Sequence, residues 1–436
     1  MNILDIVEKI IGTISDTVWP IYLPCVLILG AFLSIRTFTK IQKETSTKSK
    51  VKLSNLIAPA AISLGAMIGT GAIIGVLGAL SNLAGKGQPH IEAMAIWALI
   101  GACIMVPVSY CETLCSKIMG KTPKEYIQML LSPKLAVVYG IGFCALYIFG
   151  FGGFQFSGMD SVFTIISGEF LNISLTEVQR FLFIVVPIIL IVSVIVLSKK
   201  HDLFINAMTY MIGVAVVAYF IFFTVFIIKT ADHIPVYFSG MIEGMKNPVN
   251  AMLGVPLGFI LGMQKVSQTA ETGLGALAMA AEESDSEPRE AAMISLLPTI
   301  VTILVSIVVT TYIASYGVAN GTIIFPADSV TRLSDFFMTA SSVTGVFGLI
   351  VLSMFTVLSG LTTLLGSYYY LTVLFNNKEN TNIAIYLGLI ITAGTLAVFG
   401  FNIVFDAVDL LLFVVGGINI VALAVFATKK WKEYKL

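Results

Sequence analysis

Two long hydrophobic segments, half a chain apart, are each interrupted by a cluster of glycines. Positions 65–75 read GAMIGTGAIIG, and positions 258–275 read GFILGMQKVSQTAETGLG. Each cluster lies within a stretch long enough to cross a bilayer, which takes about 20 residues. Glycine destabilises a helix interior, and unpaired backbone groups at membrane depth are tolerated only where they are buried or line a cavity. Two breaks at corresponding places predict a secondary transporter with its binding site between them.

The composition is that of a membrane protein. Of the 436 residues, 57% are hydrophobic and 11% are charged, whereas soluble domains carry about 25% charged residues. The net charge is zero, which gives no argument for nucleic-acid binding. The cysteines and histidines form no metal-binding pattern, and no phosphate-binding GxxxxGK[ST] sequence is present. We therefore expect an all-α polytopic protein that is not an enzyme and has no cofactor.

Hydropathy over windows of about 19 residues predicts eleven membrane spans. Before them, apolar residues of the segment 1–18 recur at helical spacing and predict an amphipathic helix at the membrane interface. The predicted spans are 20–36, 57–84, 92–117, 136–167, 180–198, 203–228, 247–280, 290–317, 343–375, 381–400 and 405–427.

Basic residues concentrate in alternate loops and predict the orientation. One side carries the loops 36–52 and 117–134, then Lys199, Lys200, Arg289, Lys378 and the C-terminal tail; the other carries Lys9, Lys86, Lys229, Lys246 and Arg332. Because basic loops remain cytoplasmic, the N-terminus is expected outside and the C-terminus in the cytoplasm.

The spans divide into four parts. Residues 1–56 hold the interfacial helix, an extra span and a basic loop; residues 57–228 and 247–427 hold five spans each; residues 428–436 are a cytoplasmic tail. Five is an odd number, so the second half enters the membrane from the opposite side. This parity predicts an inverted repeat whose two first spans are the broken segments.

At these segments the sequence resembles the alanine/glycine:cation symporter family, also called sodium:alanine symporters or amino acid carrier proteins. The family's GTGNIAGV stands here as GTGAIIGV at 69–76, and its RGLFSNEAGLGSAP as KVSQTAETGLGA at 265–276. Shorter matches are YCE at 110–112 for FAE, FTVLS at 355–359 for FAFST, and SYYY at 367–370 for SYYGE.

The resemblance follows most of the chain in order. It implies a leucine-transporter-like fold, with one N-terminal helix plus a 5+5 inverted repeat, in a prokaryotic cytoplasmic membrane. It also implies symport of a small neutral amino acid such as alanine or glycine with a cation, sodium in the family, as the coupling ion. The expected partners are this small molecule and the lipid bilayer.

Three polar positions of the family are apolar in this chain. Ala72 and Ala270 stand where the family has asparagine, and Leu358 stands where it has serine. These changes leave open a proton-coupled or uncoupled transporter of a different small solute. A channel and an intramembrane enzyme are further alternatives, although the sequence shows neither a filter-like loop nor a nucleophile–base cluster.

The first break is a candidate substrate site. Opening the helix at Gly69, Thr70, Gly71 and Ala72 would turn the N–H groups of a helix start toward a substrate carboxylate. The alternative is a small-residue face that allows close helix packing. Gln155 corresponds to a glutamine of the family and would bind substrate or join two helices by a hydrogen bond.

The second break is the partner of the first. Thr269, Thr272 and Gly273 would lie at unwound backbone whose carbonyls can bind a cation or an ammonium group. Close packing of small residues is again the alternative.

Glu271, Lys265, Glu112 and Asp160 are charged residues within predicted spans, where each needs a partner or a water-filled cavity. Glu271 would contact substrate, carry a proton or form a structural ion pair. Lys265 matches a basic position of the family and is expected to pair with a carboxylate near the cytoplasmic end. Glu112 is expected to be structural, and Asp160 has no assigned role.

The ninth span is a candidate sodium site. In the fold that the resemblance implies, this span gives hydroxyl ligands to a sodium ion shared with the first broken helix. The expected ligands are Ser359 and Thr356 with the backbone carbonyl of Ile68; Thr362 and Thr363 lie on the same stretch. The alternative is that these hydroxyls bond carbonyls of their own helix.

Overall fold

A computed structural model describes residues 3–44, 53–170, 172–250, 254–375, 377–399 and 403–430. The basic residues predicted in the loop 45–52 and in the tail 431–436 lie outside these ranges. Within them, ten helices are long and apolar enough to cross a membrane. These ten match ten of the predicted spans, and the eleventh, 247–280, is divided into two short helices.

The first part of the chain runs through the extra span and five crossings. Its helices are α1 (Ile3–Glu44), α2 (Leu53–Met67), α3 (Gly71–Gly85), α4 (Ala93–Met119), α5 (Pro123–Leu130), α6 (Pro133–Ala145), η1 (Leu146–Phe151), α7 (Gly152–Ile165), η2 (Ile166–Phe170), α8 (Glu177–Arg180), η3 (Phe181–Val185), α9 (Val186–Leu197) and α10 (His201–Lys229).

A short connection then leads into the second half. Its helices are η4 (Ala231–His233), α11 (Ile234–Lys246), α12 (Leu257–Ala270), α13 (Ala276–Ala280), η6 (Ala281–Glu283), α14 (Pro288–Ile294), α15 (Leu296–Ile303), η7 (Leu304–Val309), α16 (Thr310–Ala319), α17 (Ser329–Thr344), α18 (Val346–Leu374), α19 (Glu379–Val398), α20 (Ile403–Val425) and η8 (Phe426–Lys430).

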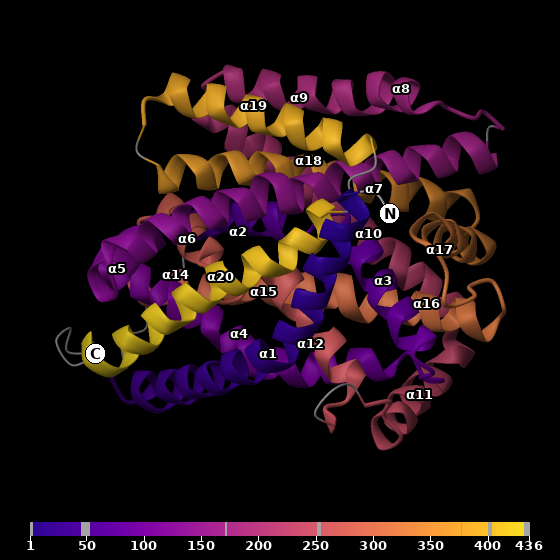
Figure 1. The fold of residues 1–436 in the computed structure, drawn as a ribbon, viewed down its shortest axis with the longest axis horizontal. Helices are drawn as coiled ribbons and strands as arrows, with labels where there is room; N and C mark the ends of the chain where they lie inside the picture. The colour runs from indigo at the N-terminus through magenta and orange to yellow at the C-terminus, as the bar shows by residue number, and fades with distance from the viewer. Residues whose placement is uncertain are drawn as a thin grey trace.

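The predicted interfacial helix over residues 1–18 is not a separate element. Residues 3–44 form one continuous helix, α1, with Pro20 and Pro24 inside it. The amphipathic segment is therefore the N-terminal extension of the first span. In Figure 1, α1 (indigo) crosses α20 (yellow), and α1 also contacts α4 and α12.

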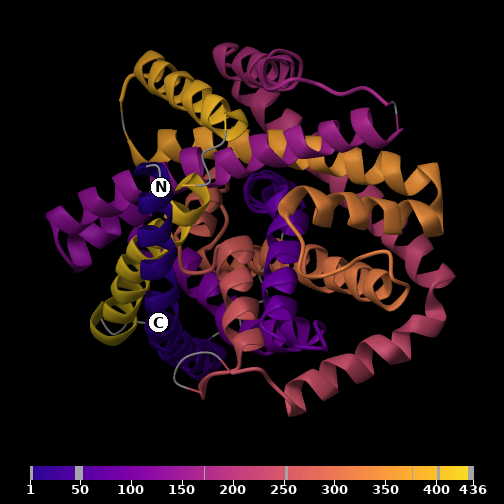
Figure 2. The ribbon, with the colours of Figure 1, turned by 45° about the vertical axis from the view of Figure 1, so that its right-hand side comes forward.

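The two broken helices run side by side through the middle of the bundle. α3 contacts α12, and α2 contacts α13, so the first half of each broken helix lies against the second half of the other. This pairing requires that the two helices run antiparallel. Figure 2 shows α2 and α3 (violet) beside α12 (salmon) at the centre, and α18 packs against α2, α7 and α10.

Candidate functional site

The first break is a short non-helical stretch between α2 and α3. The helical ladder of α2 ends with the N–H of Ile68 bonded to the carbonyl of Leu64 at 2.8 Å. The N–H of Ala72 then bonds back to Gly69 at 3.0 Å, which starts α3. The N–H of Ile73 likewise bonds to Thr70 at 3.1 Å, so the groups released from helical bonding are carbonyls at the end of α2 and the N–H groups of Thr70 and Gly71.

Gln155 of α7 holds the first break in place. Its Oε1 accepts a hydrogen bond from the N–H of Thr70 at 2.8 Å, and the Thr70 hydroxyl donates to the carbonyl of Phe154 at 2.9 Å. A methyl group on Gly69 would lie 2.5 Å from the Gln155 side chain. Gln155 is therefore the hydrogen-bond link between helices that the sequence left as an alternative, and it also lines the cavity described below.

The second break depends on left-handed backbone. Glu271, Gly273 and Gly275 have φ angles of 50°, 82° and 94°, a region that glycine enters without strain. Beside the break, the N–H of Gly275 donates to Oε2 of Glu112 at 3.1 Å. Asn419 donates to the carbonyl of Gly273 at 2.8 Å. Glu112 is thus a structural ligand of the unwound backbone.

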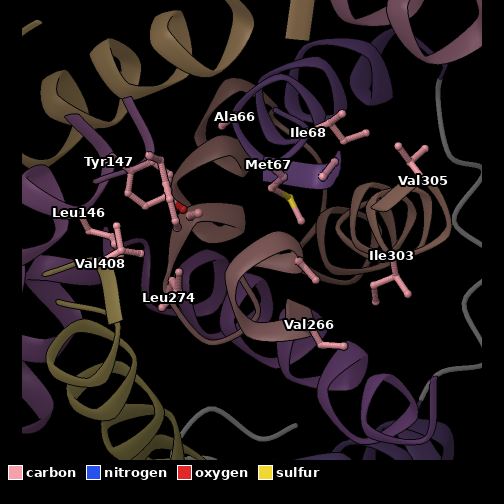
Figure 3. Packing of buried hydrophobic residues seen from close by; sticks show 14 of the residues in the cluster. Ala66, Met67, Ile68, Leu146, Tyr147, Val266, Leu274, Ile303, Val305 and Val408 are labelled. Atoms are coloured by element: carbon pink, nitrogen blue, oxygen red, sulfur yellow. The ribbon is translucent and has the colours of Figure 1, made fainter. Parts of the chain in front are cut away.

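A cavity of about 50 Å³ lies between the two breaks. Its walls include these residues: Ala66, Met67, Gly69, Gly71, Ala72, Gly75, Phe151, Phe154, Gln155, Lys265, Gln268, Thr269, Glu271, Thr363 and Val408. Figure 3 shows part of the surrounding packing, with Met67 of the first break and Leu274 of the second near Tyr147 and Val408. Gly71 faces open space, since no atom lies within 4 Å of a methyl group placed on it.

Not every predicted substrate residue reaches the cavity. Thr70 is buried behind it, bonded to α7. Thr272 is buried and its hydroxyl has no partner among the described residues, while Gly273 packs against Ile420. Thr269 lines the cavity, but its hydroxyl donates to its own helix at the Lys265 carbonyl, 2.7 Å away.

One wall of the cavity carries a polar network that the sequence did not indicate. Lys265 donates to Oε1 of Gln268 at 2.5 Å, and Gln268 donates to Oδ1 of Asp409 at 2.7 Å. Oδ2 of Asp409 accepts from Gln264 at 2.9 Å and from Trp19 of α1 at 3.0 Å. Lys265 was expected to pair with a carboxylate, but it does not contact one directly: the side-chain amide of Gln268 lies between Lys265 and Asp409.

The cavity approaches the surface on this same side. Lys265 and Gln268 of α12 and Gly75 of α3 are partly exposed, whereas Ala66 of α2 and Thr363 of α18 are buried. The path from the cavity to the exterior therefore runs between α3 and α12.

Oxygen atoms converge where α2 meets α18. The hydroxyl of Thr363 lies 3.1 Å from the carbonyl oxygen of Gly65, 3.3 Å from that of Ile68 and 3.0 Å from that of Ser359. The hydroxyl of Thr356 donates to Leu352 of its own helix at 2.9 Å. Of the expected sodium ligands, Ile68 and Ser359 meet here through their carbonyls, and Thr356 does not reach the cluster.

Two sequence signals could have found part of what was missed. Thr363 is four residues, about one helical turn, after Ser359 and so faces the same side of its helix. Asp409 is a charged residue in an apolar span, which by itself indicates a function. Asp160, by contrast, forms an ion pair with Arg180 at 2.6 Å, which is a structural contact between α7 and α8.

Solved structures similar to this chain share its fold. One is a sodium-coupled sialic acid symporter in its substrate-bound outward-open state, with a TM-score of 0.57 and 12% identity over 95% of this chain and 86% of that one. Another is a mutant manganese transporter of Eremococcus coleocola, with a TM-score of 0.51 and 10% identity over 87% and 81% of the two chains.

In sequence, no curated protein matches the chain. The profile of the sodium:alanine symporter family, however, matches residues 4–436. This match takes in both glycine breaks, the cavity between them and the oxygen cluster of α2 and α18. The chain is a multi-pass helical membrane protein and belongs to the sodium:alanine symporter family.

Proposed function

We propose that the protein moves a small neutral amino acid, alanine or glycine, across the membrane together with sodium by alternating access. The family and the fold support cation-coupled symport. The observation that carries the proposal is the meeting of two helix breaks at one cavity between antiparallel broken helices. Discontinuous helices around a midplane cavity are typical of secondary transporters.

The cavity suits a small zwitterion. At the start of α3, the backbone N–H of Gly71 lies beside the open space of the cavity and would bind the substrate carboxylate. Opposite them, α12 ends in unwound backbone next to Glu271, where carbonyl oxygens would accept hydrogen bonds from the ammonium group. The cavity is small and is lined at the first break by Gly69, Gly71 and Ala72, which favours a small substrate.

Sodium would bind at the oxygen cluster of α2 and α18. The single hydroxyl hydrogen of Thr363 cannot satisfy all three carbonyls around it. A hard cation prefers such oxygen ligands. Since Ile68 belongs to the break that borders the cavity, a sodium ion there would hold the first break in its substrate-binding shape.

The orientation belongs to the same proposal. The N-terminus would lie outside a prokaryotic cytoplasmic membrane and the C-terminus in the cytoplasm. The reason is that the basic loops lie on the same side of the membrane as the C-terminus, and basic loops remain cytoplasmic. The cavity would then open toward the outside, between α3 and α12.

Uptake into proteoliposomes tests the function. Purified protein is reconstituted, and uptake of radiolabelled alanine and glycine is measured with an inward sodium gradient, with an inward proton gradient, and with neither. We expect accumulation that requires sodium. Uptake that ignores sodium and follows the proton gradient would contradict the sodium proposal and support a proton-coupled transporter.

A transporter of a different solute is the second candidate. Ala72 lines the cavity where the family has asparagine, and Gln268 lines it where the family's RGLFSNEAGLG has phenylalanine, so the lining differs from the family's at these two positions. A competition series of amino acids against labelled alanine tests it. Stronger inhibition of labelled alanine uptake by another solute than by unlabelled alanine or glycine would favour this second candidate.

A further inference from the structure

We propose that Glu271 carries a proton that is transported together with the substrate, while Glu112 beside it stays ionised. The inference rests on the proposed function, because it assigns a second coupled ion to the same cavity. It concerns the second break, at a distance from the oxygen cluster where sodium is proposed to bind.

Two buried carboxyl groups lie at the second break. Glu112 is 0% exposed and Glu271 is 1% exposed, and the two side chains interact electrostatically. No lysine, arginine or histidine of the described residues forms an ion pair with either. Two like charges cannot both remain ionised in so apolar a place, so the pair shares one proton.

The groups around the pair are neutral. Tyrosine hydroxyls, thiols and one amide from six elements of the bundle influence it. These groups are Cys111 and Cys115 of α4, Tyr126 of α5, Tyr139 of α6, Tyr147 of η1, Tyr370 of α18 and Asn419 of α20. Lys265 lies one and a half turns away on α12, where it is bonded to Gln268.

Two polar atoms at this place lack partners within the described part of the chain. They are Oε1 of Glu112 and the hydroxyl of Tyr370. The Tyr370 side chain is fully buried and interacts electrostatically with both carboxyl groups. Buried polar groups are nearly always hydrogen-bonded. The free acceptor and the free donor leave the site able to receive a proton and to relay it.

The surroundings favour a proton over a metal ion. The N–H of Gly275 and the amide of Asn419 both point at Oε2 of Glu112, at 3.1 and 3.5 Å. The hydroxyl of Tyr147 donates to Oε2 of Glu271. Hydrogen-bond donors stabilise a carboxylate and repel a metal cation, which requires a shell of oxygen acceptors instead.

The hydrogen bonds also decide which carboxyl holds the proton. Glu112 has a backbone donor and an amide donor, so its ionised form is the better stabilised. Glu271 has one hydroxyl donor, and it lines the cavity whereas Glu112 does not. A proton on Glu271 is therefore the one that can exchange through the cavity when it opens.

This placement couples the proton to transport. Glu271 sits in left-handed backbone at the point where α12 ends, so any rearrangement of the break moves its carboxyl group. The proton binds from the side to which the cavity opens and leaves on the other side, and no bond other than the carboxyl O–H forms or breaks.

Infrared spectroscopy of the reconstituted protein tests the proton without any substrate. A protonated carboxyl group gives a carbonyl stretch that shifts on exchange into D₂O. We expect this band in the wild type at neutral pH, its loss in Glu271→Gln and its retention in Glu112→Gln. Glu92→Gln is the matched control, because Glu92 is a buried glutamate elsewhere that accepts from Ser315 at 2.5 Å.

A wild type without the band at neutral pH would overturn the proposal, and so would a band that persists undiminished in Glu271→Gln. Absence of the band in the wild type decides against the proposal even if a variant fails to fold.

Proton movement is the second readout. Proteoliposomes containing a pH-sensitive dye take up alanine under a sodium gradient, with the membrane potential clamped. We expect the lumen of wild-type vesicles to acidify in step with uptake, and this coupling to be lost in Glu271→Gln. Sodium-driven uptake by the wild type without acidification contradicts the proton proposal and leaves the proposed function standing. Absence of all alanine uptake contradicts the proposed function. The infrared band then still tests whether Glu271 is protonated.

Discussion

Gly69 and Gly71 lie two residues apart in the first break and have opposite surroundings. A methyl group on Gly69 would meet the amide of Gln155 at 2.5 Å, whereas one on Gly71 would meet nothing within 4 Å. Gly69 is therefore required for the close approach of α7, and Gly71 for the empty space of the cavity.

Substitutions at these glycines separate the two roles. Gly71→Leu is expected to fold normally and to abolish transport, because its side chain fills a cavity of about 50 Å³. Gly69→Ala is expected to lower thermal stability by displacing Gln155 from Thr70. Gly71→Ala is the control and should keep stability close to the wild type. Melting curves and alanine uptake measure both effects, and normal uptake by Gly71→Leu would show that the site is misplaced.

Gly275 is the most constrained residue of the second break. Its φ is 94°, and a methyl group on it would lie 2.3 Å from the Tyr139 hydroxyl and 3.0 Å from Pro123. We expect Gly275→Ala to destabilise the fold by about 2–4 kcal/mol, from backbone strain and overpacking together. Gly87→Ala is the comparison, since its φ of 91° has the same strain with open space around it. If both variants lose the same free energy of unfolding, the contacts with Tyr139 and Pro123 make no contribution and backbone strain alone explains the effect.

Thr363 and Ser359 make different predicted contributions to sodium binding. Thr363 brings its hydroxyl into the oxygen cluster, but Ser359 brings only its carbonyl, since its hydroxyl faces Thr356 of its own helix at 3.5 Å. Thr363→Val should raise the sodium concentration for half-maximal uptake about tenfold, equivalent to losing about 1.4 kcal/mol. Ser359→Ala should leave it nearly unchanged. A larger rise in this sodium concentration for Ser359→Ala than for Thr363→Val would place the ion at the Ser359 hydroxyl.

At the scale of elements, one carboxylate joins three helices. Asp409 of α20 accepts hydrogen bonds from Trp19 of α1 and from Gln264 and Gln268 of α12. The extra N-terminal helix is thereby tied to the helix that carries the second break.

Removing this tie should loosen the packing of α12 against α1 and α20. Asp409→Ala is expected to lower the free energy of unfolding by about 1–3 kcal/mol, at roughly 0.6 kcal/mol and up to 1.7 kcal/mol for each hydrogen bond in a membrane. Trp19→Phe removes one bond and should cost a fraction of that. Thermal unfolding in detergent measures both, and an Asp409→Ala variant as stable as the wild type would contradict the account.

Elements were more predictable from the sequence than contacts. Hydropathy located the spans because bilayer thickness fixes the length of each apolar helix. The glycines located both breaks, because Gly273 and Gly275 adopt left-handed backbone at the second break and Gly69 allows the close approach of α7 at the first. The polar network around Asp409 was not predictable, since Gln268 and Asp409 are 141 residues apart. Thr363 was placed on the right stretch but was not chosen as a ligand, because helical spacing does not by itself say which hydroxyl of one face meets the neighbouring helix.

The charged residues show the same limit. Glu271 and Lys265 were identifiable as costly charges inside a span. Their partners, Tyr147 and Gln268, are neutral side chains that no charge pattern reveals.

At the scale of the whole molecule, two halves of five crossings place their broken helices against each other. α2 meets α13 and α3 meets α12, so the cavity has one pair of half-helices on each side of it. Such a pair can separate on one side while the other stays closed, which is the geometry that alternating access needs.

The most direct test of this account is alanine uptake into proteoliposomes under an inward sodium gradient, compared between the wild type and Gly71→Leu. We predict sodium-dependent accumulation by the wild type and none by the variant, with both proteins showing similar melting temperatures. Accumulation by Gly71→Leu at the wild-type rate would contradict the claim that substrate and cation are coupled at the cavity between the two breaks.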